Sequence, residues 1–333
     1  MIKGKILITG SNGQLGQCLR KAIESSPYID QYIFTNRTDF DITNINQMEK
    51  YLQDNEDIEI IINCAAYTDV KNAETTDGFK KALLINREAV KNLAILCNKY
   101  NIFLVHFGTD YMYKTYENKP IKENEIHWSY KNEDFAIYAN EKINKYGLSK
   151  LLGIRELFIE MTKEISQSPK FVVIVISWLF SEYGKNFVKT IYDKIINGDN
   201  LEVVLTQIGS PTYAMDLANF IINKIEIEDG CFITDEINNN WDNGFDPINY
   251  AHILNFANLG LASWYDMAKF IEGIVNGNNQ IVPREKPFDN VIRPDYSVLC
   301  LDKLLSLNNN KSYIRHWTSA IYDCVNKIAE NGD

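Results

Sequence analysis

Paired cysteines, long apolar runs and an excess of positive charge are all missing from this 333-residue sequence. The six cysteines are scattered and include no Cys-x-x-Cys pair, which is typical of reduced thiols in a cytoplasmic protein rather than of disulfides or a zinc site. No apolar run reaches the about 20 residues that a membrane span needs. The formal net charge of -10 argues against nucleic acid or an anionic membrane as the main partner. We therefore expect a cytoplasmic globular protein that binds neither.

Short apolar runs alternate with helical patterns through the first 180 residues. The runs that predict strands are residues 6–9, 31–35, 58–63, 102–107 and 171–176. The patterns that predict helices are residues 14–25, 45–53, 77–100 and 140–164. This alternation favours an α/β fold in which a Rossmann-like, doubly wound parallel sheet is covered by helices on both faces.

A glycine-rich turn follows the first predicted strand and leads directly into a predicted helix. It runs from Gly10 to Gly16 and reads GSNGQLG. Gly10 permits the tight turn, Gly13 lets the backbone approach a pyrophosphate, and Gly16 lets the helix pack close to the strand. The N–H groups at the helix N-terminus then face the anion. The turn predicts a dinucleotide site; the alternative is that its glycines only end a strand.

The end of the second predicted strand bears on the choice of cofactor. An NAD site usually has an acidic residue here, which binds the ribose 2′-hydroxyl. This sequence has Thr35, Asn36 and Arg37, with no acidic residue before Asp39. Arg37 can instead neutralise a 2′-phosphate, which favours NADPH, although NADH stays possible and Arg37 can equally be a solvated turn residue.

Two Tyr-x-x-x-Lys pairs lie near the start of the helix predicted at 140–164. Tyr146 and Lys150 are one helical turn apart and share a helix face. Because an ammonium stabilises a phenolate, we expect Lys150 to lower the pKa of Tyr146, which can then exchange a proton with a carbonyl oxygen. The same spacing recurs at Tyr138 and Lys142, and either pair can arise by chance. Thr109 ends the fourth predicted strand, at the sheet edge where ligands bind.

The pattern loosens after residue 180. It predicts helices at 186–196, 212–224, 263–276 and 313–329 and a strand at 201–205. We predict an NAD(P)-binding domain at 1–180 and a smaller, mixed α/β substrate-binding region at 181–333, part of which can return to the first domain. The polar stretch 113–138 is interpreted as a loop over the site, and the Asn- and Asp-rich stretch 236–250 as a surface insertion.

These motifs together resemble the extended short-chain dehydrogenase/reductase superfamily, and within it the dTDP-4-dehydrorhamnose reductase family. The resemblance covers nearly the whole chain. The matching segments are residues 9–16, 41–43, 63–70, 109–111, 146–153, 177–180, 184–190, 207–214 and 293–294. The run QIGSPTYA at 207–214 is the most specific of them. The run after Tyr146 matches the family whereas the run after Tyr138 does not, so the resemblance selects the first pair.

The resemblance implies roles for individual residues. Tyr146 is the implied proton donor, Thr109 orients the carbonyl, and Lys150 binds the nicotinamide ribose. Together with the glycine turn and Arg37, the expected cofactor contacts are Gly10, Asn12, Gly13, Gln14, Leu15, Gly16, Arg37, Asp41, Ile42, Ala65, Ala66, Tyr67, Thr68, Phe107 and Lys150. The implied substrate contacts are Val70, Thr109, Asp110, Tyr111 and Trp178. Trp178 also has an ordinary alternative, packing in the core. Cys18 stands where some relatives place an acidic residue that helps to bind magnesium, so we do not expect a metal.

The implied reaction is reduction of the 4-keto group of dTDP-4-dehydro-6-deoxy-L-mannose to give dTDP-L-rhamnose, by a monomer or homodimer. Departures from the family pattern, such as Gly108 in place of serine and Met112-Tyr113 in place of Val-Phe, favour a shifted sugar specificity or a changed function. One alternative is a 4-ketoreductase for a different nucleotide-linked deoxy sugar. Another is a non-catalytic regulatory subunit that keeps the cofactor site, similar to the beta subunit of methionine adenosyltransferase.

Overall fold

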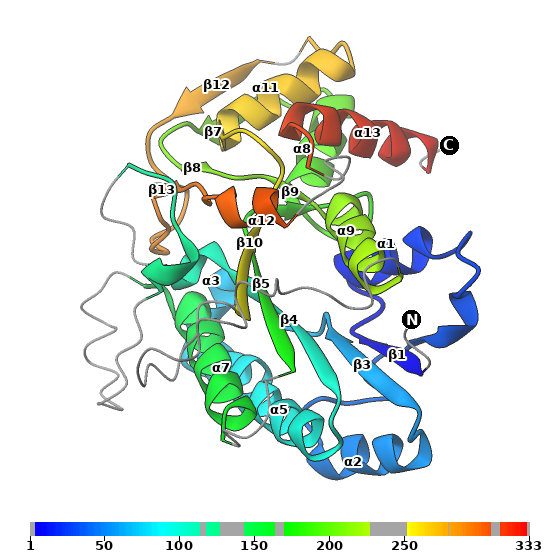
Figure 1. The fold of residues 1–333 in the computed structure, drawn as a ribbon. Helices are drawn as coiled ribbons and strands as arrows, with labels where there is room; N and C mark the ends of the chain where they lie inside the picture. Colours follow the sequence, from blue (N-terminus) through cyan, green and yellow to red (C-terminus); the bar gives the residue numbers. More distant parts are fainter. Residues whose placement is uncertain are drawn as a thin grey trace.

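The centre of the protein is a six-stranded parallel sheet with the strand order β10-β5-β4-β3-β1-β2 (Figure 1). The computed structural model describes residues 4–113, 118–126, 143–163, 170–226, 252–278, 280–307 and 314–331. The six strands are β1 (Lys5–Thr9), β2 (Tyr32–Phe34), β3 (Ile58–Asn63), β4 (Phe103–Thr109), β5 (Phe171–Ile176) and β10 (Ile253–Phe256). Each strand predicted before residue 180 is present, so the Rossmann-like α/β fold is confirmed. Strand β10 was not predicted; it pairs with β5 and brings the second half of the chain to the sheet edge.

Alternate residues of the strands face opposite sides of the sheet, and both sides are buried. In β1, Ile6 and Ile8 pack with one core, while Leu7 packs with the other. Helices α1 (Gln14–Ala22) and α9 (Ala214–Glu226) cover the first side, and α2 (Ile45–Asp54), α5 (Ala89–Lys99) and α7 (Lys145–Met161) cover the second. Burial on both sides explains why these strands read as continuous apolar runs.

The helix predicted at 77–100 is present, with a π turn inside it. It consists of α4 (Thr76–Leu83), a π turn at Leu84–Glu88 and α5. The predicted start of the next helix, near residue 140, is wrong: α7 begins at Lys145, and Asn144 is its N-cap, accepting a hydrogen bond from Gly147 N. The first three residues of that prediction, 140–142, lie outside the described residues, and so does Tyr138, the tyrosine of the rival pair with Lys142.

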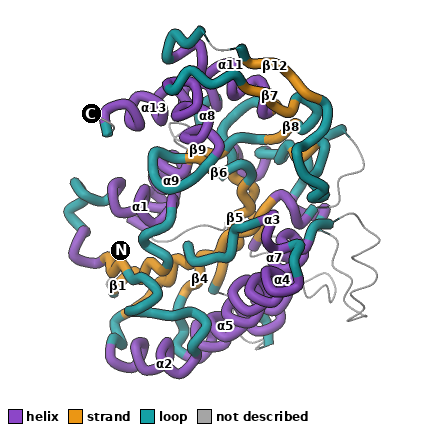
Figure 2. The backbone as a smooth tube through the Cα atoms, turned by 180° about the vertical axis from the view of Figure 1, so that it is seen from behind, coloured by secondary structure: helices purple, strands orange, loops and turns teal. Residues whose placement is uncertain are grey.

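The second half of the chain builds small mixed sheets and helices over one end of the large sheet, as both views show (Figures 1 and 2). Strands β7 (Leu201–Val204) and β12 (Ile281–Arg284) pair, as do β6 (Leu179–Phe180) and β9 (Thr212–Tyr213). Strand β8 (Ile208–Gly209) lies between β11 (Ala262–Ser263) and β13 (Tyr296–Ser297). The helices are α8 (Phe187–Ile196), α11 (Trp264–Ile274), α12 (Asp302–Ser306) and α13 (Trp317–Glu330).

Two predicted surface segments fall largely or wholly on residues that are not described. The insertion at 236–250 lies outside the described ranges, and of the loop at 113–138 only residues 113 and 118–126 are within them. Within the described ranges, no helix has the length and apolar character needed to cross a bilayer. Strand β1 has β2 on one side and β3 on the other, so the order of the chain reverses between β1 and β3. That reversal is where open α/β sheets bind ligands, beyond the carboxyl ends of their strands.

Candidate active site

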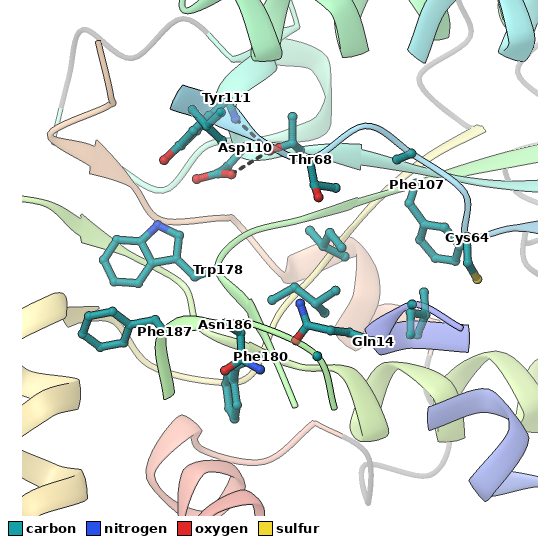
Figure 3. A pocket seen from close by; sticks show the side chains of 18 of the residues that line it. Gln14, Cys64, Thr68, Phe107, Asp110, Tyr111, Trp178, Phe180, Asn186 and Phe187 are labelled. Atoms are coloured by element: carbon teal, nitrogen blue, oxygen red, sulfur yellow. Dashed lines mark hydrogen bonds between the residues drawn. The ribbon is translucent and has the colours of Figure 1, made fainter. Parts of the chain in front are cut away.

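A cavity of about 640 Å³ lies between the carboxyl edge of the sheet and the second half of the chain (Figure 3). Its walls come from the glycine turn, the ends of β3 and β4, the start of α7, and the segment that follows β5. The size is that of a typical small-molecule site, which spans roughly 300–1,000 Å³. The sequence-predicted nucleotide turn and the predicted catalytic pair therefore open into one space.

The glycine turn has the backbone geometry that a bound pyrophosphate needs. Gly10 has a φ of 60°, and a Cβ at this position would stand 2.7 Å from Ala65 N. A Cβ at Gly16 would stand 2.5 Å from Ser11 Cα, so this glycine allows α1 to approach the turn itself. The α1 N-cap is Gly13, which provides no side chain to bond the first N–H groups of the helix. These N–H groups line the cavity and fit an anionic dinucleotide.

Thr109, Tyr146 and Lys150 line the same cavity. Thr109 Oγ1 donates a hydrogen bond to Asp110 Oδ1 at 3.0 Å. The Thr109 hydroxyl is also hydrogen-bonded to the Tyr146 hydroxyl. The Tyr146 ring packs edge-on against Tyr111, with ring centroids 6.1 Å apart. The phenol hydroxyl is therefore positioned by a neighbouring hydroxyl.

The expectation that Lys150 lowers the pKa of Tyr146 is wrong. Burial raises the pKa of the phenol, the Asp110 carboxylate raises it further, and the hydrogen bond with Thr109 only partly opposes both. Burial also lowers the pKa of Lys150 to about 8, because a charged ammonium loses hydration there. Lys150 is 3% exposed. Desolvation therefore outweighs the attraction between the two groups that the spacing alone suggested.

Asp110 is a buried carboxylate at the centre of a hydroxyl cluster. Thr109 and Ser177 donate hydrogen bonds to its two oxygens, the second at 3.1 Å, and Ser297 also bonds it. Burial nevertheless raises the pKa of Asp110 to about 6. Ser297 comes from the second half of the chain, so this carboxylate ties the two walls of the cavity together.

The raised pKa predicts that Asp110 makes stability depend on pH. A carboxyl whose pKa is higher in the folded state contributes stability below its ordinary pKa of 3.8 and loses it as the pH rises through about 6. Relative to Asp110→Asn, the wild-type free energy of unfolding should fall by about 3 kcal/mol over that interval, at 1.36 kcal/mol per pKa unit. Urea unfolding of both proteins at intervals from about pH 4 to pH 8 measures this difference. Parallel stability curves would contradict it.

Asn86 is a functional candidate that the sequence analysis missed. It lies in the π turn, is 1% exposed, and bonds the backbone of Tyr67 in both directions: Tyr67 N to Asn86 Oδ1 at 2.9 Å and Asn86 Nδ2 to Tyr67 O at 3.0 Å. The same Nδ2 donates to Ser149 Oγ at 2.9 Å. Asn86 thus joins the loop after β3 to the helix that carries Tyr146 and Lys150. Its only sequence signal is a polar residue in an amphipathic helix, which is too common to be informative.

Most of the residues predicted for the site line the cavity. These are Asn12, Gly13, Gln14, Leu15, Ala66, Thr68, Val70, Phe107, Thr109, Asp110, Tyr111, Tyr146, Lys150 and Trp178. Gly10, Gly16, Ala65 and Tyr67 are not among the lining residues. Arg37 and Asp41 are not in the wall and bond each other, Nε to Oδ2 at 3.2 Å. Ile42 is buried in the core beneath the sheet.

The cavity is also lined by residues that the sequence analysis did not assign to the site. They are Asn63, Cys64, Gly108, Ile176, Leu179, Phe180, Gly184, Lys185, Asn186, Phe187, Trp264 and Met267. Several belong to the segments 177–180 and 184–190, whose position after a predicted strand was a usable signal. Trp264 and Met267 belong to α11, far along the chain, and no local pattern predicts that they reach this cavity.

Comparison with known proteins places the chain among sugar-nucleotide reductases. Residues 4–330 match the family model described as RmlD substrate binding domain. A dTDP-4-dehydrorhamnose reductase of Aggregatibacter actinomycetemcomitans is 32% identical over 79% of this chain and 76% of its own. A dTDP-4-keto-6-deoxy-D-glucose reductase of Streptomyces niveus is 26% identical over 95% of this chain and 94% of its own.

Solved structures of the same family match this chain over nearly its full length. The crystal structure of a dTDP-4-dehydrorhamnose reductase from Bacillus anthracis in complex with NADP has a TM-score of 0.77 and 28% identity, covering 98% of this chain and 99% of that one. The match spans both the sheet and the small sheets of the second half. From the family match over residues 4–330 and these relatives, we conclude that the chain belongs to the RmlD substrate binding domain family.

Proposed function

We propose that this protein is an NADPH-dependent reductase that converts the 4-keto group of dTDP-4-dehydro-6-deoxy-L-mannose into the alcohol of dTDP-L-rhamnose. One observation carries the proposal: the Tyr146 hydroxyl, bonded to Thr109, opens into the same cavity as the uncapped N-terminus of α1. A proton donor and a dinucleotide cradle facing one space are the two parts that such a reduction requires. The dTDP-4-dehydrorhamnose reductases among the relatives support the choice of sugar nucleotide.

The cofactor fits the residues on one wall of the cavity. Gly13, Gln14 and Leu15 would hold the pyrophosphate through the N–H groups of α1, and Lys150 would bind the nicotinamide ribose. When bound, the reduced nicotinamide supplies hydride to the carbonyl carbon. The protein's own task is then to orient the carbonyl and to protonate its oxygen.

Tyr146 is suited to protonate that oxygen. A tyrosine phenol is neutral near pH 7, which is the form that can donate a proton. Thr109 holds the hydroxyl in place, and Asp110 in turn fixes the Thr109 proton. The oxygen that develops during reduction is an alkoxide and is more basic than a phenolate, so transfer from Tyr146 is downhill.

A second candidate differs only in the sugar. The Streptomyces niveus relative is a dTDP-4-keto-6-deoxy-D-glucose reductase and matches 95% of the chain, so a different dTDP-4-keto-6-deoxy sugar is the main competing substrate. A non-catalytic, cofactor-binding subunit is the third reading. The cavity carries a positioned phenol, hydroxyl and amine, and this weighs against a purely regulatory role.

The assay that separates these readings uses the purified protein, NADPH and a set of dTDP-4-keto-6-deoxy sugars. The proposal expects loss of NADPH absorbance with dTDP-4-dehydro-6-deoxy-L-mannose and the highest kcat/KM for that sugar. A higher kcat/KM for another configuration would favour the second candidate. Tight NADPH binding without turnover of any keto sugar nucleotide would favour the regulatory subunit.

The proposed NADPH preference predicts a specific effect at Arg37. The Arg37 guanidinium is exposed, so a 2′-phosphate near the end of β2 can reach it. Its ion pair with Asp41 holds the side chain in place. Arg37→Ala should raise the KM for NADPH about tenfold and leave the KM for NADH unchanged, since a charged hydrogen bond to phosphate is worth about 1.5–3 kcal/mol. Lys50→Ala, which removes another exposed i,i+4 ion pair, is the matched control. An unchanged ratio of the two KM values would show that Arg37 has no part in cofactor choice.

A further inference from the structure

The most specific motif of the sequence, at residues 207–214, contacts a pair of tryptophans and not the Tyr146 hydroxyl. Gln207 is 5% exposed, and its Oε1 accepts a hydrogen bond from Trp264 Nε1 at 3.1 Å. Two residues later, a Cβ at Gly209 would stand 2.6 Å from Cε2 of Trp178. The motif therefore orients one indole through Gln207 and leaves room for the other at Gly209.

The two indoles are stacked on each other. The ring centroids of Trp178 and Trp264 are 3.6 Å apart and their planes differ by 11°. Phe187 packs against Trp264 with a centroid separation of 4.5 Å. Trp264 is the first residue of α11, where the Ser263 hydroxyl and the Asp266 carboxylate form a capping box that fixes the start of the helix. Trp264 is thus fixed by its helix, by Gln207 and by Phe187, whereas Trp178 stacks on Trp264.

Trp178 needs such support because its backbone is strained. Its φ of 49° lies in the left-handed region, which is unfavourable for a bulky side chain. This conformation directs the chain out of β5 and into β6, and Thr212 N bonds the Trp178 carbonyl at 3.2 Å. A strained residue in a cavity wall persists only where its neighbours over-determine it. Trp264 is the aromatic neighbour that does so.

Trp178 lies across the cavity from Asp110 and Tyr111, as Figure 3 shows, with Phe187 beside it. Trp178, Trp264 and Phe187 all line the space. A flat aromatic wall opposite the carboxylate and phenol suits a ligand with one apolar face and one hydroxyl-bearing face. A deoxy sugar with its methyl group is a ligand of that kind.

We propose that Trp264, fixed by Gln207, is a positioning residue for substrate selection: it holds Trp178 in its strained conformation as the wall against which the sugar nucleotide packs. The inference rests on the proposed function, since it names how the same cavity selects its substrate. Trp264 acts through Trp178 and takes no part in proton transfer. Its loss therefore weakens substrate binding and leaves the cofactor site and the Tyr146 proton intact.

The test is a double-mutant cycle on the purified protein. Trp264→Leu should raise the KM for the keto sugar nucleotide about tenfold, with little change in kcat or in NADPH Kd, and Trp264→Phe should restore most of the affinity. In a Trp178→Ala background, Trp264→Leu should have no further effect, because the residue it supports is already gone. Gly209→Ala, which leaves Trp264 in place but pushes on the Trp178 indole, should reproduce the higher KM.

Trp317→Leu is the control, because Trp317 also bonds an oxygen through Nε1 at 3.1 Å and packs against a phenylalanine, but is not among the residues that line the cavity. An equal rise in KM for Trp317→Leu, or a full effect of Trp264→Leu in the Trp178→Ala background, would overturn the proposal.

Calorimetry with dTDP-L-rhamnose compares the same variants by substrate affinity, without turnover. A wild-type protein that neither binds nor turns over any dTDP-sugar would sink the proposed function and this proposal together. Normal wild-type binding with unchanged Trp264→Leu and Gly209→Ala would sink this proposal alone.

Discussion

Replacing Tyr146 with phenylalanine is expected to lower kcat by about a hundred- to ten-thousandfold, the usual contribution of a positioned general acid. The phenol is the group that Thr109 orients into the cavity, and the substitution removes only its hydroxyl. The ring keeps its edge-on contact with Tyr111, so the fold and the cofactor wall should stay as they are. Steady-state NADPH oxidation measures kcat, and calorimetry measures the NADPH Kd, which should change little.

The rival pair supplies the comparison for this experiment. Tyr138→Phe makes the same chemical change at the other Tyr-x-x-x-Lys spacing and should leave kcat near the wild-type value. If Tyr138→Phe abolished turnover and Tyr146→Phe did not, the assignment of the proton donor would be wrong. If both variants retained full activity, neither tyrosine would be the acid, and the reductase mechanism proposed here would fail.

Replacing Gly153 with alanine is expected to lower the free energy of unfolding by about 3 kcal/mol, at the upper end for overpacked sites. A Cβ on Gly153 would stand 1.7 Å from the carbonyl oxygen of Asn86 and 2.8 Å from its carbon. Both are backbone atoms of the π turn, so neither can rotate away. Helix α7 and the π turn would have to separate, and Asn86 would then lose its hydrogen bond to Ser149 on α7. Urea unfolding measures the stability, and the same protein should show a lower kcat.

Gly273 is the matched control for that change. It also lies within a helix, α11, but a Cβ there would meet no atom within 4 Å. Gly273→Ala should therefore leave stability unchanged or raise it by about 0.4–1 kcal/mol, since alanine restricts the unfolded chain. Equal stabilities for the two variants would contradict the close approach between α7 and the π turn.

Local sequence was sufficient for the parts of this protein that depend on neighbours along the chain. The strand at 171–176 is entirely apolar and the strand at 58–63 mostly so, because a parallel strand is buried on both faces. The glycine turn could be predicted for the same reason, since Gly10 needs a positive φ and Gly16 a close contact within six residues of each other. Both requirements concern residues close together in the sequence, so a local pattern predicts them.

The parts that could not be predicted depend on residues distant in the sequence. The pKa of Tyr146 follows from how much of the cavity wall excludes water, which spacing to Lys150 cannot reveal. The π turn carries Asn86 against Gly153, which is more than sixty residues away in the sequence. Strand β10 was missed because it joins the sheet only through its pairing with β5.

By itself, then, the sequence determined the parallel sheet, the dinucleotide turn and the presence of a tyrosine and a lysine on one helix face. Tertiary structure decided that burial raises the pKa of Tyr146, that Asn86 joins the π turn to the loop after β3, and that Trp264 reaches the cavity and stacks on Trp178. The physical reason is the separation along the sequence over which each interaction acts. Periodicity and turn geometry act over a few residues, whereas desolvation, stacking and the fit of one helix against another depend on which distant segments the fold brings together.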